Sequence, residues 1–331
     1  MSKSLSWDTR GQLVYSPVGS DGGPSLTIYN GSIYAAWKGF GGDQQIYFSS
    51  FDGKFWAPQK PIPDAYSSIG PSMVVFRGRL WAVMKGRTDD ERFWYTSFDG
   101  SSWGKCVSIS YQWMDTTGVG GSLAVFNGLV YMAYKGMSGD DGIYFTNFDG
   151  SKWSEKTKIL DPARTKLRPA LAVWSDSSGY GQRLVLVWKE SGEEETLWYS
   201  TFDGSVWAEQ QPIPHAASAD GPALAFYRGS IHAAWRGPRD DERIWGASFD
   251  GVSWTVPSNL PDNFASCLAP ALVVFRDQLY AAFKGRQGDC RIWWTRTTPR
   301  LSRHAPIHYQ RSPRRTSPPT YTTSATISLA G

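Results

Sequence analysis

The sequence predicts an all-β fold, namely a six-bladed β-propeller of four-stranded blades. We expect the N-terminal strand to complete the last blade and so to close the ring. Three observations support this prediction. A Phe-Asp-Gly-x-x-Trp motif returns five times, its aspartate always fourteen residues after a Lys or Arg. The repeat period is 47–54 residues, within the range of propeller and solenoid repeats. No stretch shows a helical period of apolar residues.

Each repeat contains the signals of four strands. An apolar run such as Gly70–Phe76 has the length of a strand buried on both faces. A tight turn such as Asn30-Gly31 follows, where positive φ is required. The second strand ends on the basic residue, as in Tyr34–Lys38, and the third resembles Ile46–Ser49. The Phe-Asp-Gly turn then leads to the Trp, which we expect to begin the fourth strand.

The two ends of the repeated region complement each other. Lys284 ends the second strand of a sixth repeat, but Thr298 and Pro299 stand where the turn has Asp and Gly. The sixth repeat therefore lacks its Trp strand. A spare Trp7 precedes the first complete repeat, at about the spacing that separates other motif tryptophans from the next basic residue. We expect residues 1–298 to form one closed propeller, because closure leaves few exposed strand edges.

Composition limits the other possibilities. The net charge of +4 comes from residues 299–331, which carry five Arg and no acid and are rich in Pro, Ser and Thr. We expect this tail to be disordered, with tethering to nucleic acid or an acidic surface as the alternative. Nucleic-acid binding by the propeller itself is not expected.

Three Cys without metal spacing predict neither a disulfide framework nor a metal site, and no cofactor motif is present. Without a signal-peptide core or a membrane-length apolar run, we expect a cytoplasmic protein, with non-classical release as an option.

The loop between the second and third strands carries the candidate binding residues. A basic residue, a carboxylate and aromatic residues return there in six copies, whereas an enzyme needs one asymmetric site. Aromatic rings with charged partners suit sugars, and weak repeated sites gain avidity. The alternative is that these are surface ion pairs and core tryptophans. The predicted ligand-binding residues are Trp37, Lys38, Asp43, Trp81, Lys85, Asp90, Trp94, Lys135, Asp141, Tyr144, Trp235, Arg236, Asp241, Trp245, Lys284, Asp289 and Trp293.

The blade pattern resembles the tandem-repeat β-propeller lectins, including the fungal and bacterial fucose-specific type. The most specific part of the match is the motif Phe51–Trp56, and the likeness extends over about residues 5–298. The resemblance implies a multivalent lectin whose partners are glycans or glycoconjugates. In that family an Arg on the second strand and a Glu on the third grip the sugar. Those places here hold Tyr34 or Trp81 and Phe48 or Tyr95, so we expect Lys and Asp of the loop to replace the grip.

Two other functions remain open from the sequence. One is a glycosidase of the sialidase type, because the segment Ser97–Trp103 resembles a shortened Asp box of sialidases, although Asp boxes are structural and imply no catalysis. A non-enzymatic protein-interaction propeller is the third possibility. We expect no enzymatic activity and fewer than six functional sites. Glu190 follows Lys189 where most copies have Gly, and Gly246 replaces the third-strand aromatic residue in the fifth copy.

Overall fold

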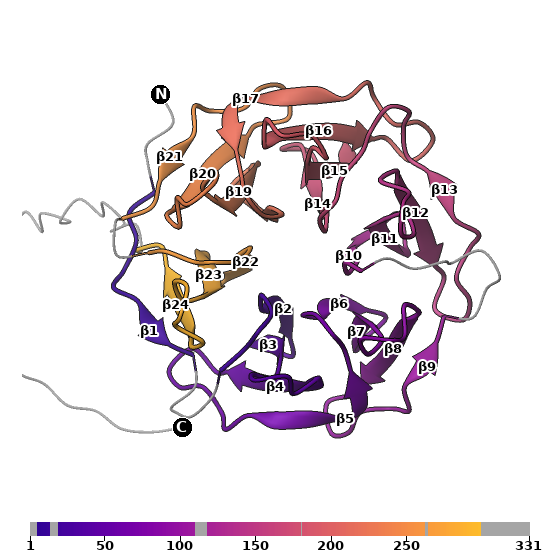
Figure 1. Cartoon of the computed structure of the whole chain (residues 1–331), viewed down its shortest axis with the longest axis vertical. Coiled ribbons are helices and arrows are strands. Elements are labelled where there is room, and N and C mark those ends of the chain that lie inside the picture. The colour runs from indigo at the N-terminus through magenta and orange to yellow at the C-terminus, as the bar shows by residue number, and fades with distance from the viewer. Residues whose placement is uncertain (1–4, 14–18, 110–117, 180, 262–263, 299–331) are drawn as a thin grey trace, which may run out of the picture. The chain divides into compact units, whose positions relative to one another are not determined.

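The computed structural model describes residues 5–13, 19–109, 118–179, 181–261 and 264–298. These residues form six four-stranded antiparallel sheets arranged around a central axis, shown in Figure 1. The prediction of a six-bladed propeller is therefore confirmed. Residues 299–331 lie outside the described residues, so the predicted disordered tail stays a prediction. No described segment forms a helix that is long and apolar enough to cross a membrane.

The strands follow one another outward from the axis in every blade. The first blade contains β2 (Ser25–Tyr29), β3 (Ser32–Lys38), β4 (Gln45–Phe51) and β5 (Lys60–Tyr66). The second contains β6 (Ser72–Phe76), β7 (Arg79–Lys85), β8 (Phe93–Phe98) and β9 (Val107–Ser108). The third contains β10 (Ser122–Phe126), β11 (Leu129–Lys135), β12 (Ile143–Phe148) and β13 (Thr157–Lys158).

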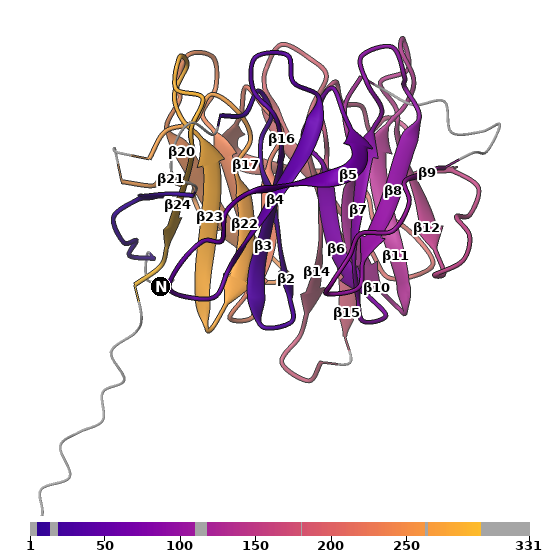
Figure 2. The ribbon, with the colours of Figure 1, turned by 90° about the horizontal axis from the view of Figure 1, so that it is seen from below.

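The remaining three blades repeat this order. The fourth contains β14 (Ala170–Ser175), β15 (Gln182–Lys189), β16 (Thr196–Phe202) and β17 (Gln211–Ala217). The fifth contains β18 (Ala223–Tyr227), β19 (Ser230–Arg236), β20 (Ile244–Phe249) and β21 (Ser258–Asn259). The sixth contains β22 (Ala271–Phe275), β23 (Gln278–Lys284) and β24 (Ile292–Arg296), completed by β1 (Gly11–Gln12). Figure 2 shows the sheets from the side, with the β14–β15 hairpin extending beyond its neighbours.

The turns have the geometry that their residues dictate. Asn30 and Gly31 both adopt positive φ, 46° and 73°, as a two-residue hairpin turn requires. In the first Phe-Asp-Gly turn, Asp52 Oδ1 accepts hydrogen bonds from the backbone N–H groups of Lys54 and Phe55, at 2.7 and 2.8 Å. Gly53 takes a φ of 104°, which residues other than Gly rarely adopt. These contacts explain why the motif recurs.

The prediction that the motif Trp begins the fourth strand was wrong. Trp56 makes one isolated bridge with Phe51, and the outer strand β5 begins four residues later, at Lys60. The same interval separates Trp103 from β9. The reason lies in packing between blades. The Trp103 ring lies 5.4 Å from Phe48 of the preceding blade, so the Trp anchors neighbouring blades rather than extending its own sheet.

The N-terminal segment closes the ring as predicted. Trp7 bridges Thr297, and β1 pairs with β24. The Thr295 hydroxyl donates to the Asp8 carbonyl at 2.8 Å, just as the Ser49 hydroxyl donates to Ala57 in the first blade. Asp8 also forms an ion pair with Arg296 at 3.0 Å. Trp7 and Asp8 thus occupy the place that the motif Trp and its successor occupy in the other blades.

Candidate functional site

The six basic residues that end the second strands bond to groups of the loop that follows them or of the connector that precedes their blade. Lys38 and Lys85 are only 5% and 3% exposed. The Lys85 ammonium donates to Ser68 Oγ at 3.1 Å and to the Arg87 carbonyl at 3.2 Å. Lys38 donates to Asp21 and to the Gly39 carbonyl, both at 3.1 Å. These ammonium groups hold the loop and the blade connector together.

The other basic residues have related partners. Lys135 donates to three loop carbonyls and forms an ion pair with Asp141 at 3.3 Å. Arg236 donates to the Arg239 carbonyl at 2.8 Å. Lys284 lies 3.2 Å from the Cys267 thiol. Lys189 donates to the Glu190 carbonyl at 3.3 Å. Each copy therefore places a positive charge against carbonyl, carboxylate, hydroxyl or thiol groups of its loop or connector.

The predicted carboxylates and third-strand aromatic residues do come together. In the second blade, Trp94 donates its indole N–H to Asp90 Oδ2 at 2.7 Å. Arg92 lies between them in sequence, binds both oxygens of Asp90 at 2.8 and 3.1 Å, and stacks over Trp94 with its Cζ 5.0 Å from the ring centroid. The same Asp-x-Arg-x-Trp cluster forms at Asp241, Arg243 and Trp245 and at Asp289, Arg291 and Trp293.

The arginines of these clusters were missed by the sequence prediction. The Asp-x-Arg-x-Trp spacing, which recurs in three repeats at the start of the third strand, was the available signal. The Arg243 hydrogen bonds are the first cause that lowers the pKa of Asp241 to about 2. In each cluster the guanidinium lies over the indole face and is paired with a carboxylate. The carboxylate therefore offsets much of the Arg charge, and the Arg covers much of the indole face that a sugar would need.

The first and third blades use a Tyr in place of the Trp. Tyr47 donates to Asp43 Oδ2 at 3.0 Å. Tyr144 donates to Asp140 Oδ2 at 2.8 Å. The equivalent of Asp43 in the third blade is thus Asp140, whereas the predicted Asp141 pairs with Lys135.

The predicted second-strand tryptophans lie apart from these clusters. Trp37 and Trp235 are buried, with 0% and 1% exposure, in the packing between blades. Trp81 donates to the Phe76 carbonyl at 3.1 Å and contacts Tyr95 and Phe148, at 6.0 and 5.0 Å between ring centroids. They contribute to the core rather than to the loop clusters.

Aromatic clusters fill most of the spaces between blades. Tyr34 and Phe48 stack at 6.5 Å, and they contact Phe98 and Trp103 of the next blade at 5.9 and 5.4 Å. Equivalent side chains fill the interfaces that follow the second, third, fourth and sixth blades, with Val185 as the one aliphatic member. These are the places where the resemblance would put the lectin family's Arg and Glu.

The interface between the fifth and sixth blades differs from the other five. Here His232 stands in the place of Tyr34, Gly246 in that of Phe48, and Thr297 in that of Phe98. Of the aromatic cluster only the Trp remains, as Trp7. A pocket of about 610 Å³ opens where the rings are absent.

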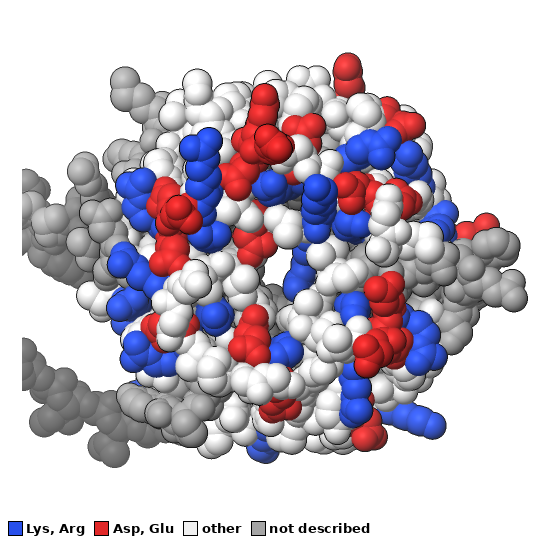
Figure 3. Space-filling view, in the orientation of Figure 1, with Lys and Arg blue, Asp and Glu red and all other residues white. Residues whose placement is uncertain are grey.

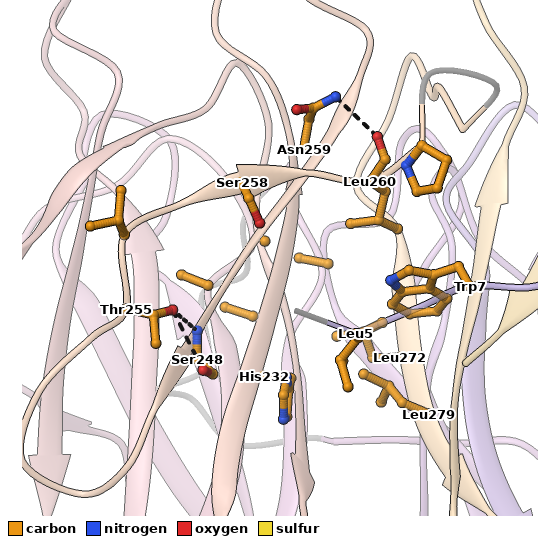
Figure 4. A pocket seen from close by; sticks show the side chains of 16 residues that line it. Leu5, Trp7, His232, Ser248, Thr255, Ser258, Asn259, Leu260, Leu272 and Leu279 are labelled. Atoms are coloured by element: carbon orange, nitrogen blue, oxygen red, sulfur yellow. Dashed lines mark hydrogen bonds between the residues drawn. The ribbon is translucent and has the colours of Figure 1, made fainter. Parts of the chain in front are cut away.

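The pocket combines an apolar wall with uncharged polar groups. In Figure 4, Leu5, Trp7, Leu272 and Leu279 lie on one side and Ser248, Thr255 and Ser258 on the other. His232 lies between them. Burial lowers the pKa of His232 to about 4, so its imidazole is neutral near pH 7. No Asp, Glu, Lys or Arg is among the described residues that line this pocket.

Comparison with known proteins supports the fold. No family model and no curated protein matches the sequence. The structure is similar to a protein of unknown function from Dyadobacter fermentans, with a TM-score of 0.65 at 12% identity, covering 88% of this chain and 98% of that one. It is also similar to the six-bladed fucose-specific lectin of Aleuria aurantia, with a TM-score of 0.57 at 14% identity, covering 82% and 90%.

A third similar structure is an enzyme. The GH43_1 enzyme from Xanthomonas citri, solved with xylose, has a TM-score of 0.52 at 12% identity, covering 86% of this chain and 88% of that one. At such identities the likeness concerns the fold alone. The chain thus has the six-bladed propeller fold found in a fucose-specific lectin, as the sequence resemblance implied, and its ligand has to be argued from its own residues.

Proposed function

We propose that this protein is a carbohydrate-binding protein and that it holds an uncharged sugar in the pocket between the fifth and sixth blades. One observation carries the proposal. This is the one interface among the six in which His, Gly and Thr stand in place of three aromatic side chains that fill the space between blades. A pocket of about 610 Å³ results. Its volume lies within the usual range for small-ligand sites, about 300–1,000 Å³.

The lining has the chemistry that a sugar requires. A pyranose has apolar C–H faces, which pack on aromatic and aliphatic side chains, and hydroxyl groups that need hydrogen-bond partners. Trp7 and the leucines provide the first surface. The hydroxyl groups of Ser248, Thr255 and Ser258 and the neutral imidazole of His232 provide the second. Because the described lining residues have no charged side chain, we expect neutral sugars to bind more tightly than sialic or uronic acids.

The same lining favours binding over hydrolysis. Most glycoside hydrolases flank the scissile bond with two carboxyl groups. The described residues around the pocket provide no carboxyl group. A glycosidase therefore has less support here than a lectin.

The repeated loop clusters are the second candidate surface for sugars, and with them the predicted multivalency. They support this role less well, since their lysines are bonded within the blade edge and their arginines lie on the Trp rings. The outer edge of each Asp-x-Arg-x-Trp cluster stays accessible, with Arg side chains 48–61% exposed. The two surfaces predict different mutational effects.

A glycan-array screen of three proteins tests the proposal. The first is the wild type. The second is His232→Tyr, which restores a residue found at this place in the first, third and sixth blades and fills the pocket. The third carries Asp90→Ala, Asp241→Ala and Asp289→Ala together. We expect binding of neutral glycans by the wild type, at least ten-fold weaker binding by His232→Tyr, and little change in the triple variant.

Thermal melting of all three proteins provides the control for folding. Loss of binding in the triple variant alone would place the site in the loop clusters and support the prediction of multivalent binding. An array on which the folded wild type binds no glycan would overturn the carbohydrate proposal and favour the protein-interaction alternative.

A further inference from the structure

A second cavity, of about 200 Å³, lies where the first strands of all six blades begin. Its lining comes from the connector before each first strand, so the cavity lies on the axis of the ring. Figure 3 shows a hollow at the centre of the molecule with acidic and basic side chains near its margin. This cavity is separate from the pocket between the fifth and sixth blades, with which it shares no lining residue.

Three charged residues line the cavity, and one of them, Asp21, already pairs with Lys38 at 3.1 Å. The other two, Arg168 and Asp220, break the repeat that surrounds them. The position that precedes the first strand by two residues is Gly in four blades and Ala in one, but Arg168 in the fourth. The position before it is aliphatic or Gly in five blades, but Asp220 in the fifth. Residues that only build the ring recur from blade to blade, whereas these two charges occur once each. Single occurrence in a symmetric frame is what an asymmetric ligand site requires.

The Arg168 side chain extends along the cavity from the fourth blade to the second. Its Nη2 donates to the Gly70 carbonyl at 2.9 Å, and its Nη1 donates to the Pro71 carbonyl at 3.3 Å. It passes the third blade closely, because a Cβ added at Gly120 would lie 3.3 Å from its Nε. The guanidinium is therefore fixed in place by neutral acceptors, and no carboxylate is bonded to it.

Asp220 approaches the same cavity from the neighbouring blade. Its Oδ1 accepts the Gly221 N–H and its Oδ2 the Ala269 N–H, both at 2.7 Å. Each oxygen keeps a further lone pair. Asp220 and Arg168 are close enough for their charges to interact, yet no ion pair or hydrogen bond joins them.

Apart from the ion-paired Asp21, the cavity thus has two opposite charges, Arg168 and Asp220, that do not bond to each other. Withdrawing charges from water is unfavourable unless each gains a partner, and backbone dipoles supply only part of that compensation. A ligand with a negative and a positive group would complete both. The rest of the lining includes the aliphatic side chains of Ile69, Val119, Leu167 and Leu268, beside Asp21 and Ser68.

We propose that the axial cavity binds a small zwitterion, a free α-amino acid with an aliphatic side chain. Its carboxylate would pair with Arg168 and its ammonium group with Asp220, while its side chain would contact the leucine, isoleucine and valine walls. The site is independent of the proposed sugar pocket, so either could fail without the other.

Isothermal titration of the whole chain with L-leucine tests this proposal. Two analogues that each lack one charge, 4-methylpentanoate and isoamylamine, serve as matched ligands. Two variants serve as matched proteins. Arg168→Gly installs the residue that four other blades use at this place, and Asp220→Asn removes the charge but keeps an acceptor for the backbone N–H groups. The sugar-pocket variant His232→Tyr is the control that should bind L-leucine normally.

We expect L-leucine to bind to the wild type at one site per chain. Each analogue should bind at least ten-fold more weakly, and each of the two cavity variants should lose at least ten-fold in affinity while melting cooperatively. Three results would overturn the proposal: no heat of binding with the folded wild type, equal binding of 4-methylpentanoate, or L-leucine binding that is unchanged in Arg168→Gly.

Discussion

A buried or half-buried basic residue stabilises each loop between the second and third strands of a blade. Lys85 is 3% exposed, and its ammonium bonds to Ser68 and to the Arg87 carbonyl. A hydrogen bond to a charged group contributes more to stability than one between neutral groups. The lysines that the sequence placed in a ligand grip are thus better explained as structural residues of the loop.

Lys85→Met tests this structural role. Methionine keeps most of the aliphatic stem but cannot donate to Ser68 or Arg87. We expect the free energy of unfolding to fall by about 1.5–3 kcal/mol, measured by urea denaturation. Glycan binding per folded molecule should stay unchanged. Arg92→Ala, which removes a side chain that is 61% exposed, is the control and should change stability little. Loss of sugar binding in a fully folded Lys85→Met would instead support the prediction that the loop lysines bind the sugar.

The turn aspartates predict a pH dependence of stability. Backbone N–H groups of Ser205 and Val206 bond to Asp203 and hold its pKa at about 2. Backbone and hydroxyl hydrogen bonds likewise hold the pKa of Asp149 at about 2. The pKa of an unfolded Asp is near its ordinary value of about 4. The carboxylate therefore stabilises the fold fully above that pH, and its contribution is lost as the pH falls toward about 2.

Melting temperatures of the wild type and Asp203→Asn between about pH 5 and about pH 2 test this dependence. We expect the variant to melt lower at the upper end and the difference to shrink toward the lower end. A difference that is constant over the whole range would show that the hydrogen bonds, and not the charge, account for the stabilisation.

Among the elements, the N-terminal segment joins the last blade to the first. Leu13 is fully buried between the last and first blades, and Asp8 pairs with Arg296 at 3.0 Å. Without this segment β24 becomes an open edge and the ring loses its closing contacts. We expect a variant that begins at residue 19 to melt at a much lower temperature and to aggregate, as measured by circular dichroism and light scattering.

Leu13→Ala is the graded control for that truncation. Removing a fully buried leucine costs about 2–5 kcal/mol of unfolding free energy, while the backbone pairing remains. We expect this variant to stay monodisperse and folded at room temperature. Equal behaviour of the truncated and full-length proteins would mean that the segment adds nothing to the ring.

At the level of elements, much could be predicted from the sequence. The fixed interval from the basic residue to Phe-Asp-Gly located the hairpins, and the missing turn after Lys284 with the spare Trp7 indicated closure. The fourth strand was misplaced because an aromatic residue after a turn is as typical of a strand start as of an anchor between blades. Only the contact of Trp103 with Phe48 across two blades separates these possibilities.

The whole molecule is a repeat whose symmetry is broken at a few places, and those places carry the candidate sites. The sequence showed that Gly246 lacked the aromatic ring of its counterparts, and the natural interpretation was a weakened fifth site. The structure shows that the missing ring opens the pocket, because the other interfaces are filled by such rings. Which positions of successive blades face each other is a property of the ring, so a single repeat could not reveal it.

The number of binding sites follows from this broken symmetry. If the pocket between the fifth and sixth blades is the sugar site, isothermal titration with a monosaccharide found on the array should give one site per chain. His232→Tyr should abolish that heat of binding, and neither protein should agglutinate glycan-coated beads as a monomer, since one site cannot crosslink. Three equal sites would match the three Asp-x-Arg-x-Trp clusters and would show that the loops bind. The stoichiometry therefore decides between a single pocket and multivalent binding by the loop clusters, independently of which sugar is recognised.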